Sequence, residues 1–315
     1  MKSKNEMHTS KIAIVGAGFV GSTAAYAILN EGSASEIALI DVNKEKAQGE
    51  AMDLQHGLLF KPNVKIEFGN NYKLCRNVEI VVITAGAHQK PRETRIDLVK
   101  KNSAIFKEMI PQITKNNKDC ILLVVSNPLD ILTYLTLKYS KFPKNKVIGS
   151  GTILDTARFR YLLSQYFEVS PNSVHAYILG EHGDSSFPVW SAANIAGVNL
   201  KNFRGYSRKS MDKIYAETKN AAYEVIAKKG ATYYAIGLGI SKIIKSILSN
   251  QNEVLALSSY LTNYNGISDV CLSVPTIVNR SGIKEHIVLP LNSLEKKQLK
   301  KSADIIKSVI KGCRC

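Results

Sequence analysis

The feature that most constrains this chain is a cluster of three glycines directly after a short apolar segment. Lys11–Gly16 reads KIAIVG and has the continuous apolar character of a buried strand. The glycines follow in the order G-x-G-x-x-G, at Gly16, Gly18 and Gly21, and a helical stretch then runs to Asn30. The first glycine permits a tight turn, the second a close approach to the backbone, and the third close packing of helix on strand. The sequence therefore predicts the strand, turn and helix that begin a βαβ unit.

A carboxylate follows this turn at the distance that is typical of dinucleotide-binding sites. Asp41 ends a second apolar segment, Glu36–Asp41, twenty residues after Gly21. In dinucleotide-binding turns, an acidic residue at this distance hydrogen-bonds the ribose hydroxyls and repels a 2′-phosphate, which favours NAD over NADP. The alternative is a glycine-rich turn with an unrelated capping aspartate. Gly86 and Ala87, after a later apolar segment, form a second turn that is small enough for close cofactor approach.

Apolar and helical segments alternate as far as residue 150. This alternation is typical of βαβ units in a parallel sheet. Pro111 is expected to break or bend the long helical region in which it lies. The predicted strands are 11–16, 36–41, 64–68, 79–84, 121–126 and 146–149, and the predicted helices are 19–30, 44–58, 92–116 and 129–139.

The pattern changes after residue 150. Helices are predicted at about 152–167, 211–228, 231–248 and 293–311, and strands at 173–179, 253–261, 269–274, 276–279 and 286–289. We therefore expect an α/β fold with two domains. Residues 1–150 are predicted to form a Rossmann-type, doubly wound parallel sheet that binds NAD, and residues 151–315 an α+β domain.

The chain carries a formal net charge of +16 over 315 residues, so a nucleic-acid-binding protein is an open alternative. The basic residues are scattered, with local clusters at 141–146, 296–301 and 307–314. Apart from Phe142, no aromatic residue interleaves with them at a spacing suited to base stacking. We interpret the charge as a solvated lysine-rich surface and expect no nucleic acid partner.

Cysteine usage and the first residues favour a cytoplasmic protein with no membrane partner. Five cysteines are an odd number for a disulfide framework, and no Cys/His spacing matches a zinc site, so no metal is expected. Met1–Ser10 has no apolar core of a signal peptide. Ile12–Asn30 lacks charge over 19 residues, but its glycines favour a buried strand, turn and helix over a membrane span.

Four strings carry a family resemblance. They occur in order as TAGAHQKPRETR at 84–95, VSNPLD at 125–130, GSGTILDTARFR at 149–160 and HAYILGEHGD at 175–184. With them the chain resembles bacterial-type L-lactate dehydrogenases over almost its whole length. The resemblance implies an NAD-dependent enzyme that reversibly transfers hydride between NADH and pyruvate, giving L-lactate, and that works in glycolysis and fermentation.

The catalytic residues implied by the resemblance suit this chemistry. His182 has the side chain whose ordinary pKa, about 6.5, lies near neutrality, so it is able to give a proton to a carbonyl oxygen. A carboxylate partner, Asp155, would orient the imidazole and stabilise its charged form. Arg158 lies three residues after Asp155 on the same helix face, and its guanidinium matches a substrate carboxylate.

The resemblance assigns further roles to other positions. Arg95 polarises the reacting carbonyl after the loop at 88–94 closes over substrate. Asn127 hydrogen-bonds substrate or cofactor, and Thr232 lines the substrate pocket. The cofactor contacts implied in this way are Val20, Lys46, Tyr72 and Ile236.

Gln89 is predicted to decide which substrate is used. Related malate enzymes carry arginine at the matching position, where it pairs with a second carboxylate. A neutral glutamine leaves that carboxylate unpaired and so favours pyruvate over oxaloacetate. Arg92 stands where the family usually has glycine, and its charge keeps a malate dehydrogenase-like enzyme open as the alternative.

Two further residues match a regulatory site of the bacterial family. Arg160 and His175 correspond to positions that bind fructose 1,6-bisphosphate at a subunit interface, and both side chains suit phosphate. The resemblance therefore implies a homotetramer that the bisphosphate activates. The alternative is that both residues are present without any response.

Overall fold

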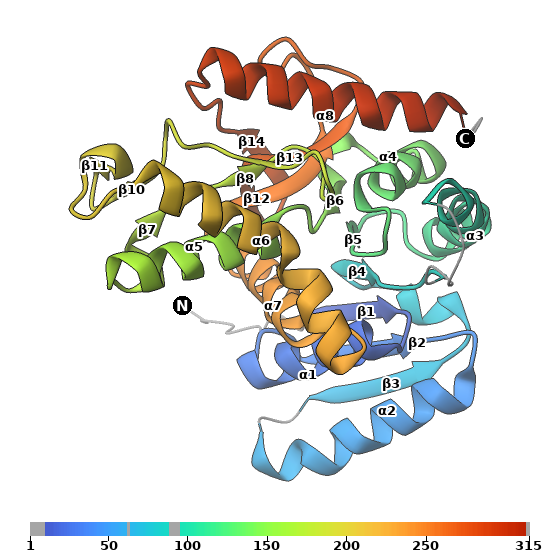
Figure 1. Ribbon diagram of the computed structural model, residues 1–315. Helices are drawn as coiled ribbons and strands as arrows, with labels where there is room; N and C mark the ends of the chain where they lie inside the picture. Colours follow the sequence, from blue (N-terminus) through green and yellow to red (C-terminus); the bar gives the residue numbers. More distant parts are fainter. Residues whose placement is uncertain (1–9, 62–63, 88–94, 313–315) are drawn as a thin grey trace, which may run out of the picture.

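The computed structural model describes residues 10–61, 64–87 and 95–312, with Arg95 described by its backbone alone. One nine-stranded sheet forms the centre of the molecule, with helices on both faces (Figure 1). Its strands are β1 (Lys11–Val15), β2 (Glu36–Ile40), β3 (Lys65–Gly69), β4 (Ile80–Ile83), β5 (Ile121–Val124), β6 (Val147–Gly149), β12 (Glu253–Tyr260), β13 (Cys271–Asn279) and β14 (Gly282–His286). The helices are α1 (Phe19–Glu31), α2 (Lys44–His56), α3 (Arg95–Asn116), α4 (Leu129–Ser140), α5 (Ile153–Phe167), α6 (Arg208–Lys229), α7 (Tyr234–Leu248) and α8 (Ser293–Gly312).

The first six strands form the predicted doubly wound parallel sheet. Their order is β3-β2-β1-β4-β5-β6, and every pair among them is parallel. The winding reverses between β1 and β4, and parallel sheets of this kind bind ligands outside the carboxyl ends of the strands at that point. The expected fold class is confirmed, and the switch point directs attention to the turns that follow β1 and β4.

The long strands of the second half extend the same main sheet. β12 joins β6 through an antiparallel bridge between Ser258 and Gly149, and β13 and β14 continue the same sheet outward. Five two-residue strands form two small sheets outside the main sheet. One holds β7 (Val174–His175), β10 (Asn194–Ile195) and β11 (Val198–Asn199), and the other holds β8 (Ile178–Leu179) and β9 (Phe187–Pro188). The residues that follow β8 lie against α8 and the edge of β13, and this is where His182 is found.

Several expected element boundaries are wrong. Pro111 does not break α3, which continues through it as one helix. β13 also passes through Pro275, which was expected to separate two strands. The carbonyl of Pro275 accepts from the N–H of Ile287, so the missing donor of the proline faces the side on which β14 has just ended. The last strand is Gly282–His286 rather than 286–289, and the strand expected at 173–179 is divided into β7 and β8.

Helix α7, from the second half of the chain, packs on α1 from the first half (Figure 1). Gly237 makes this close approach possible, because a Cβ there would lie 2.7 Å from Cγ2 of Thr23. Apolar residues of both halves fill the same core beneath the two helices, among them Ile28 on α1, Ile243 on α7 and Leu257 on β12. Among the described residues, none of the helices is both long and apolar enough to cross a membrane.

We expect Gly237→Ala to lower the free energy of unfolding by about 1–3 kcal/mol, because the added methyl group overpacks the contact with Thr23. Gly239→Ala is the matched control on the same helix, since its Cβ would meet only Cγ2 of Ile153 at an ordinary 3.6 Å. Alanine is the better helix former, so the control should be neutral or slightly more stable. Urea unfolding of both variants checks this, and equal destabilisation would contradict it.

Candidate active site

The turn between β1 and α1 needs two of its three glycines for packing and leaves the third open. Gly16 has a φ of +106°, and a Cβ there would lie 2.6 Å from the backbone N of Ala85. A Cβ at Gly21 would overlap the carbonyl oxygen of Gly16. Gly18 is different, because a Cβ there meets nothing within 4 Å. The turn is thus tightly built on the protein side and open on the side from which a pyrophosphate would approach.

Charge and hydrogen bonding at this turn also fit a dinucleotide. No side chain caps the N-terminus of α1, and its first turn carries no acidic residue, so its N–H groups and positive dipole end remain for phosphate. Asp41, at the end of β2, accepts from the N–H of Ala17 at 2.7 Å and from the N–H of Asn43 at 2.9 Å. The carboxylate is therefore fixed beside the glycine turn.

The other expected cofactor residues surround the same edge of the sheet. Val20 and Ile236 both pack at the margin of the core between α1 and α7. Tyr72 is partly buried, which raises its pKa, and the negative charge of Asp41 acts in the same direction. Lys46 is exposed in the first turn of α2, where its backbone N–H donates to the capping side chain of Asn43.

The second turn is held by a residue that the sequence analysis missed. Asn102, on α3, is 1% exposed. Its Oδ1 accepts from the N–H of Ala87 at 2.7 Å, and its Nδ2 donates to the carbonyls of Ala87 and Asn127 at 3.2 and 2.7 Å. A Cβ on Gly86 would touch the same amide. One buried side chain thus brings the ends of β4 and β5 together and orients the backbone of Asn127.

The structure brings His182, Asp155 and Arg158 into one cluster. Nδ1 of His182 lies 2.6 Å from Oδ2 of Asp155, and Nη1 of Arg158 donates to Oδ1 of the same carboxylate at 3.2 Å. Asp155 and Arg158 project from the first two turns of α5, whereas His182 follows β8. The His182 side chain keeps 28% of its surface exposed, so the ring is not sealed off from solvent.

Opposing effects set the proton affinity of this cluster. Burial alone would lower the pKa of His182, but the negative charge and hydrogen bond of Asp155 outweigh it and raise the pKa above its ordinary 6.5. Burial would raise the pKa of Asp155, but His182 and Arg158 lower it overall. The imidazole is therefore poised to hold a proton near neutral pH and to give it up to a substrate.

Asp130 is a second residue of the site that sequence reasoning did not identify. It is 2% exposed, and its carboxylate accepts from the backbone N–H of His182 at 2.7 Å and from the hydroxyl of Ser258 at 2.6 Å. Burial raises the pKa of Asp130 to about 6. The only available signal was its place at the end of VSNPLD, since the contact is made through the backbone of His182.

The remaining expected residues lie elsewhere or outside the described residues. Gln89 falls in the segment 88–94, which the structure does not describe, and the Arg95 side chain is also outside the described part. Thr232 lies between α6 and α7. Arg160 donates through Nε to the carbonyl of Ala176 at 2.8 Å, beside the exposed His175. No metal-binding group of three or more His, Cys, Asp or Glu residues occurs among the described residues.

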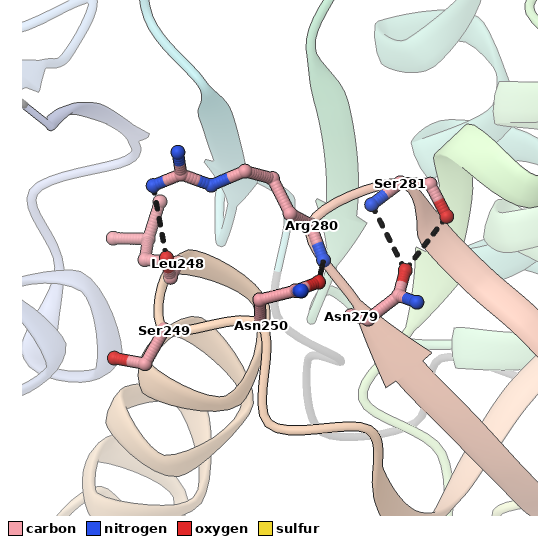
Figure 2. Close-up of a pocket in the computed structure, with 6 residues that line it drawn as sticks. All are labelled: Leu248, Ser249, Asn250, Asn279, Arg280 and Ser281. Carbon is pink, nitrogen blue, oxygen red and sulfur yellow. Dashed lines mark hydrogen bonds between the residues drawn. The ribbon is translucent and has the colours of Figure 1, made fainter.

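A surface hollow at the end of α7 is not connected with this chemistry. Figure 2 shows its polar groups bonded to one another, with Arg280 donating to the carbonyl of Leu248 at 2.9 Å and to Oδ1 of Asn250 at 3.2 Å. Asn279 accepts from both the N–H and the hydroxyl of Ser281. The residues that line the hollow belong to the end of α7 and to the turn between β13 and β14. None of the expected site residues is among them.

A dinucleotide-binding turn and a histidine–aspartate pair in one chain are features of an NAD-dependent oxidoreductase that acts on a CH–OH group. The model of the lactate/malate dehydrogenase NAD-binding domain matches residues 10–149, and that of the α/β C-terminal domain of the same family matches residues 152–314. The chain belongs to the lactate/malate dehydrogenase family.

Individual relatives resemble the chain over almost its whole length. An L-lactate dehydrogenase of Acetivibrio thermocellus is 54% identical over 98% of both chains. L-lactate dehydrogenase 1 of Clostridium acetobutylicum is 52% identical over 95% of this chain and 96% of its own. The crystal structure of the minor L-lactate dehydrogenase from Enterococcus mundtii, in a ligand-bound form, superposes with a TM-score of 0.94 at 42% identity, covering 96% of this chain and 98% of that chain.

We expect Asp155→Asn to lower the pKa of His182 below 6.5, because burial and the charge of Arg158 then outweigh the negative charge of Asp130 that remains. A proton donor that is mostly neutral at pH 7 should reduce the rate of carbonyl reduction by about 10²-fold or more. NMR titration of the imidazole and the pH dependence of kcat/KM measure both effects.

Asp212→Asn provides the control, since Asp212 pairs with Arg208 on the exposed face of α6. It should leave the His182 titration unchanged. A His182 pKa that stays above 6.5 in Asp155→Asn would show that another group raises it.

Proposed function

We propose that the chain is an L-lactate dehydrogenase, which reversibly reduces pyruvate to L-lactate. The observation that carries the proposal is the contact of 2.6 Å between His182 and Asp155, with Arg158 bonded to the same carboxylate. Two relatives that are 54% and 52% identical to the chain bear the name L-lactate dehydrogenase, which supports the choice of substrate.

Bound NADH supplies the hydride that reaches the carbonyl carbon of the substrate. His182 gives its proton to the carbonyl oxygen, and its raised pKa keeps that proton available at neutral pH. Asp155 holds the ring through Nδ1, so Nε2 faces the substrate, and it stabilises the charged imidazole before the transfer. In the reverse direction the neutral ring accepts the proton of the lactate hydroxyl.

Arg158 is proposed to bind the substrate carboxylate. Its contact with Asp155 uses Nη1, and a guanidinium has five N–H donors in a planar fork. The remaining donors suit the two oxygens of a carboxylate. Arg95, Asn127 and Thr232 are proposed to complete the pocket by polarising the carbonyl, hydrogen-bonding the substrate and lining its wall, respectively.

Gln89 is proposed to exclude a second substrate carboxylate. Wild-type enzyme should therefore oxidise NADH much faster with pyruvate than with oxaloacetate, because the amide of Gln89 does not neutralise the extra negative charge. Side-by-side rates with fructose 1,6-bisphosphate present make the comparison. A preference for oxaloacetate would mean that Arg92 or another residue supplies the missing positive charge, and the lactate assignment would fall.

The proposal extends to a homotetramer activated by fructose 1,6-bisphosphate. Arg160 and His175 lie close together, since Arg160 bonds the carbonyl of Ala176, and both side chains suit phosphate. Large apolar side chains on the packed helices α1 and α7 also favour association of copies. They are Phe19 (69% exposed), Tyr26 (62%), Tyr234 (65%) and Leu238 (66%).

Titration of the bisphosphate in phosphate-free buffer at neutral pH tests the regulatory part. We expect the rate of pyruvate reduction and the sedimentation coefficient to rise together, because a ligand bound between subunits stabilises the assembly that holds it. Glucose 6-phosphate serves as a control with one phosphate. The regulatory proposal fails if the bisphosphate changes neither quantity.

We further propose that residues 1–150 bind NAD and residues 151–315 carry the substrate chemistry, in the cytoplasm. The glycine turn lies in the first part, and His182, Asp155 and Arg158 lie in the second. Cys75, Cys120 and Cys271 are buried free thiols, which supports a reducing compartment.

A further inference from the structure

The segment that carries His182 has no regular structure of its own. Gly180 forms an isolated antiparallel bridge with Ser273 of β13, and regular structure resumes only at β9. Between these points the backbone makes two short turns, from Gly183 to the carbonyl of Glu181 and from Ser186 to the carbonyl of Gly183. The position of the imidazole therefore depends on groups that reach this segment from other elements.

Ser302, on α8, makes several of these contacts at once. Its hydroxyl donates to the carbonyl of Ser185 at 2.7 Å and accepts from the N–H of Glu181 at 3.3 Å. It also lies 2.9 Å from the hydroxyl of Ser185, which donates to the carboxylate of Glu181 at 2.5 Å. Ser302 thus contacts the residue before His182 and the residue three positions after it.

Ser302 is tightly packed against the segment that it contacts. Its side chain is fully buried. Gly180 has a φ of +92°, and a Cβ there would lie 2.5 Å from Oγ of Ser302. α8 is itself anchored in its first turn, where the carboxylate of Glu295 accepts from the N–H and the hydroxyl of Ser191. The hydroxyl of Ser302 therefore lies on an anchored helix, directly against the backbone of Gly180.

We propose that Ser302 is a positioning residue, through which α8 holds the catalytic-histidine segment in register with Asp155. Asp130 fixes the N–H of His182 from one side, and Ser302 fixes Glu181 and Ser185 from the other. Without the hydroxyl, the N–H of Glu181 and the carbonyl of Ser185 lose a buried partner, and the segment has freedom to shift. Displacement of a reacting group by about 1 Å lowers rates by up to about 10²-fold. This inference rests on the proposed role of His182 as proton donor.

Two substitutions separate hydrogen bonding from packing. Ser302→Ala removes the hydroxyl, whereas Ser302→Cys keeps a group of similar volume that is a weak hydrogen-bonding partner. We expect both to lower kcat for pyruvate reduction by about tenfold or more and to lower the pKa of His182 toward 6.5, since the pair with Asp155 is held less tightly. The Kd for NADH should stay within about twofold of wild type, because the glycine turn is not touched.

Ser246→Ala is the matched control. Ser246 is also a fully buried helical serine, and its hydroxyl contacts the carbonyl of Lys242 in its own helix and the carboxylate of Glu253 on β12. The control should lose stability in the same way as Ser302→Ala and keep the kcat and the His182 pKa of wild type. If Ser302→Ala does not fold, Ser302→Cys supplies the comparison.

The positioning role is overturned if Ser302→Ala loses stability but retains the kcat and the His182 pKa of wild type. It is also overturned if Ser302→Cys behaves as wild type, because packing alone would then suffice. The imidazole titration by NMR needs no substrate. Failure of wild-type enzyme to reduce pyruvate would therefore count against the proposed function, and an unshifted imidazole pKa in the variants would count against the role of Ser302.

Discussion

The contact between His182 and Asp155 joins two elements that only the tertiary packing of the chain brings together. Asp155 belongs to α5, and His182 lies 27 residues later on an irregular segment. Two threonines make the contact possible, Thr152 at the N-cap of α5 and Thr156 within the helix. The hydroxyl of Thr152 donates to the carbonyl of Ile178 at 2.5 Å, and that of Thr156 accepts from the N–H of Ile178 at 3.1 Å. The helix is thereby fixed to β8 just ahead of the histidine.

The electrostatics of the site follow from this packing. Partial burial lowers the pKa of the imidazole, and the carboxylate of Asp155 reverses that tendency. Asp130 adds a second negative charge that favours the protonated ring, but burial raises the pKa of Asp130 to about 6. Below that pH, Asp130 becomes neutral while it still bonds the segment of His182. The proton affinity of the His182 ring is therefore coupled to the protonation of a carboxyl group that bonds its backbone N–H.

Local patterns were sufficient to predict the first half of the fold. A glycine turn after an apolar strand is required by local steric contacts, so a short stretch of sequence is enough to predict it. Gly16 and Gly21 make the close backbone contacts that the motif implies. Asp155 and Arg158 could also be predicted, because their spacing and their neighbours fit the family resemblance. The attachment of β12 to β6 could not be predicted, since antiparallel pairing between residues as distant as Ser258 and Gly149 leaves no local pattern.

The positioning residues were missed for a related reason. Asn102 and Asp130 act on backbone atoms of other segments, and Ser302 does so from a helix near the C-terminus. Any residue sequence presents such backbone groups, so nothing in the sequence around His182 marks what will bind them. Pro275 illustrates the converse. Its residue type predicts a break, but the direction of its missing N–H, which only the assembled sheet defines, makes it harmless.

The proposed hydride and proton transfer requires that the cofactor edge and the histidine keep a constant separation. The sheet meets this requirement because both are attached to it. The glycine turn follows β1, and the segment of His182 is bridged to β13 through Gly180 and Ser273. α7 strengthens the connection by packing on α1 while its apolar face rests on the same core as β12. The histidine–aspartate pair of the second half is thus held to the dinucleotide turn by shared packing rather than by a linker.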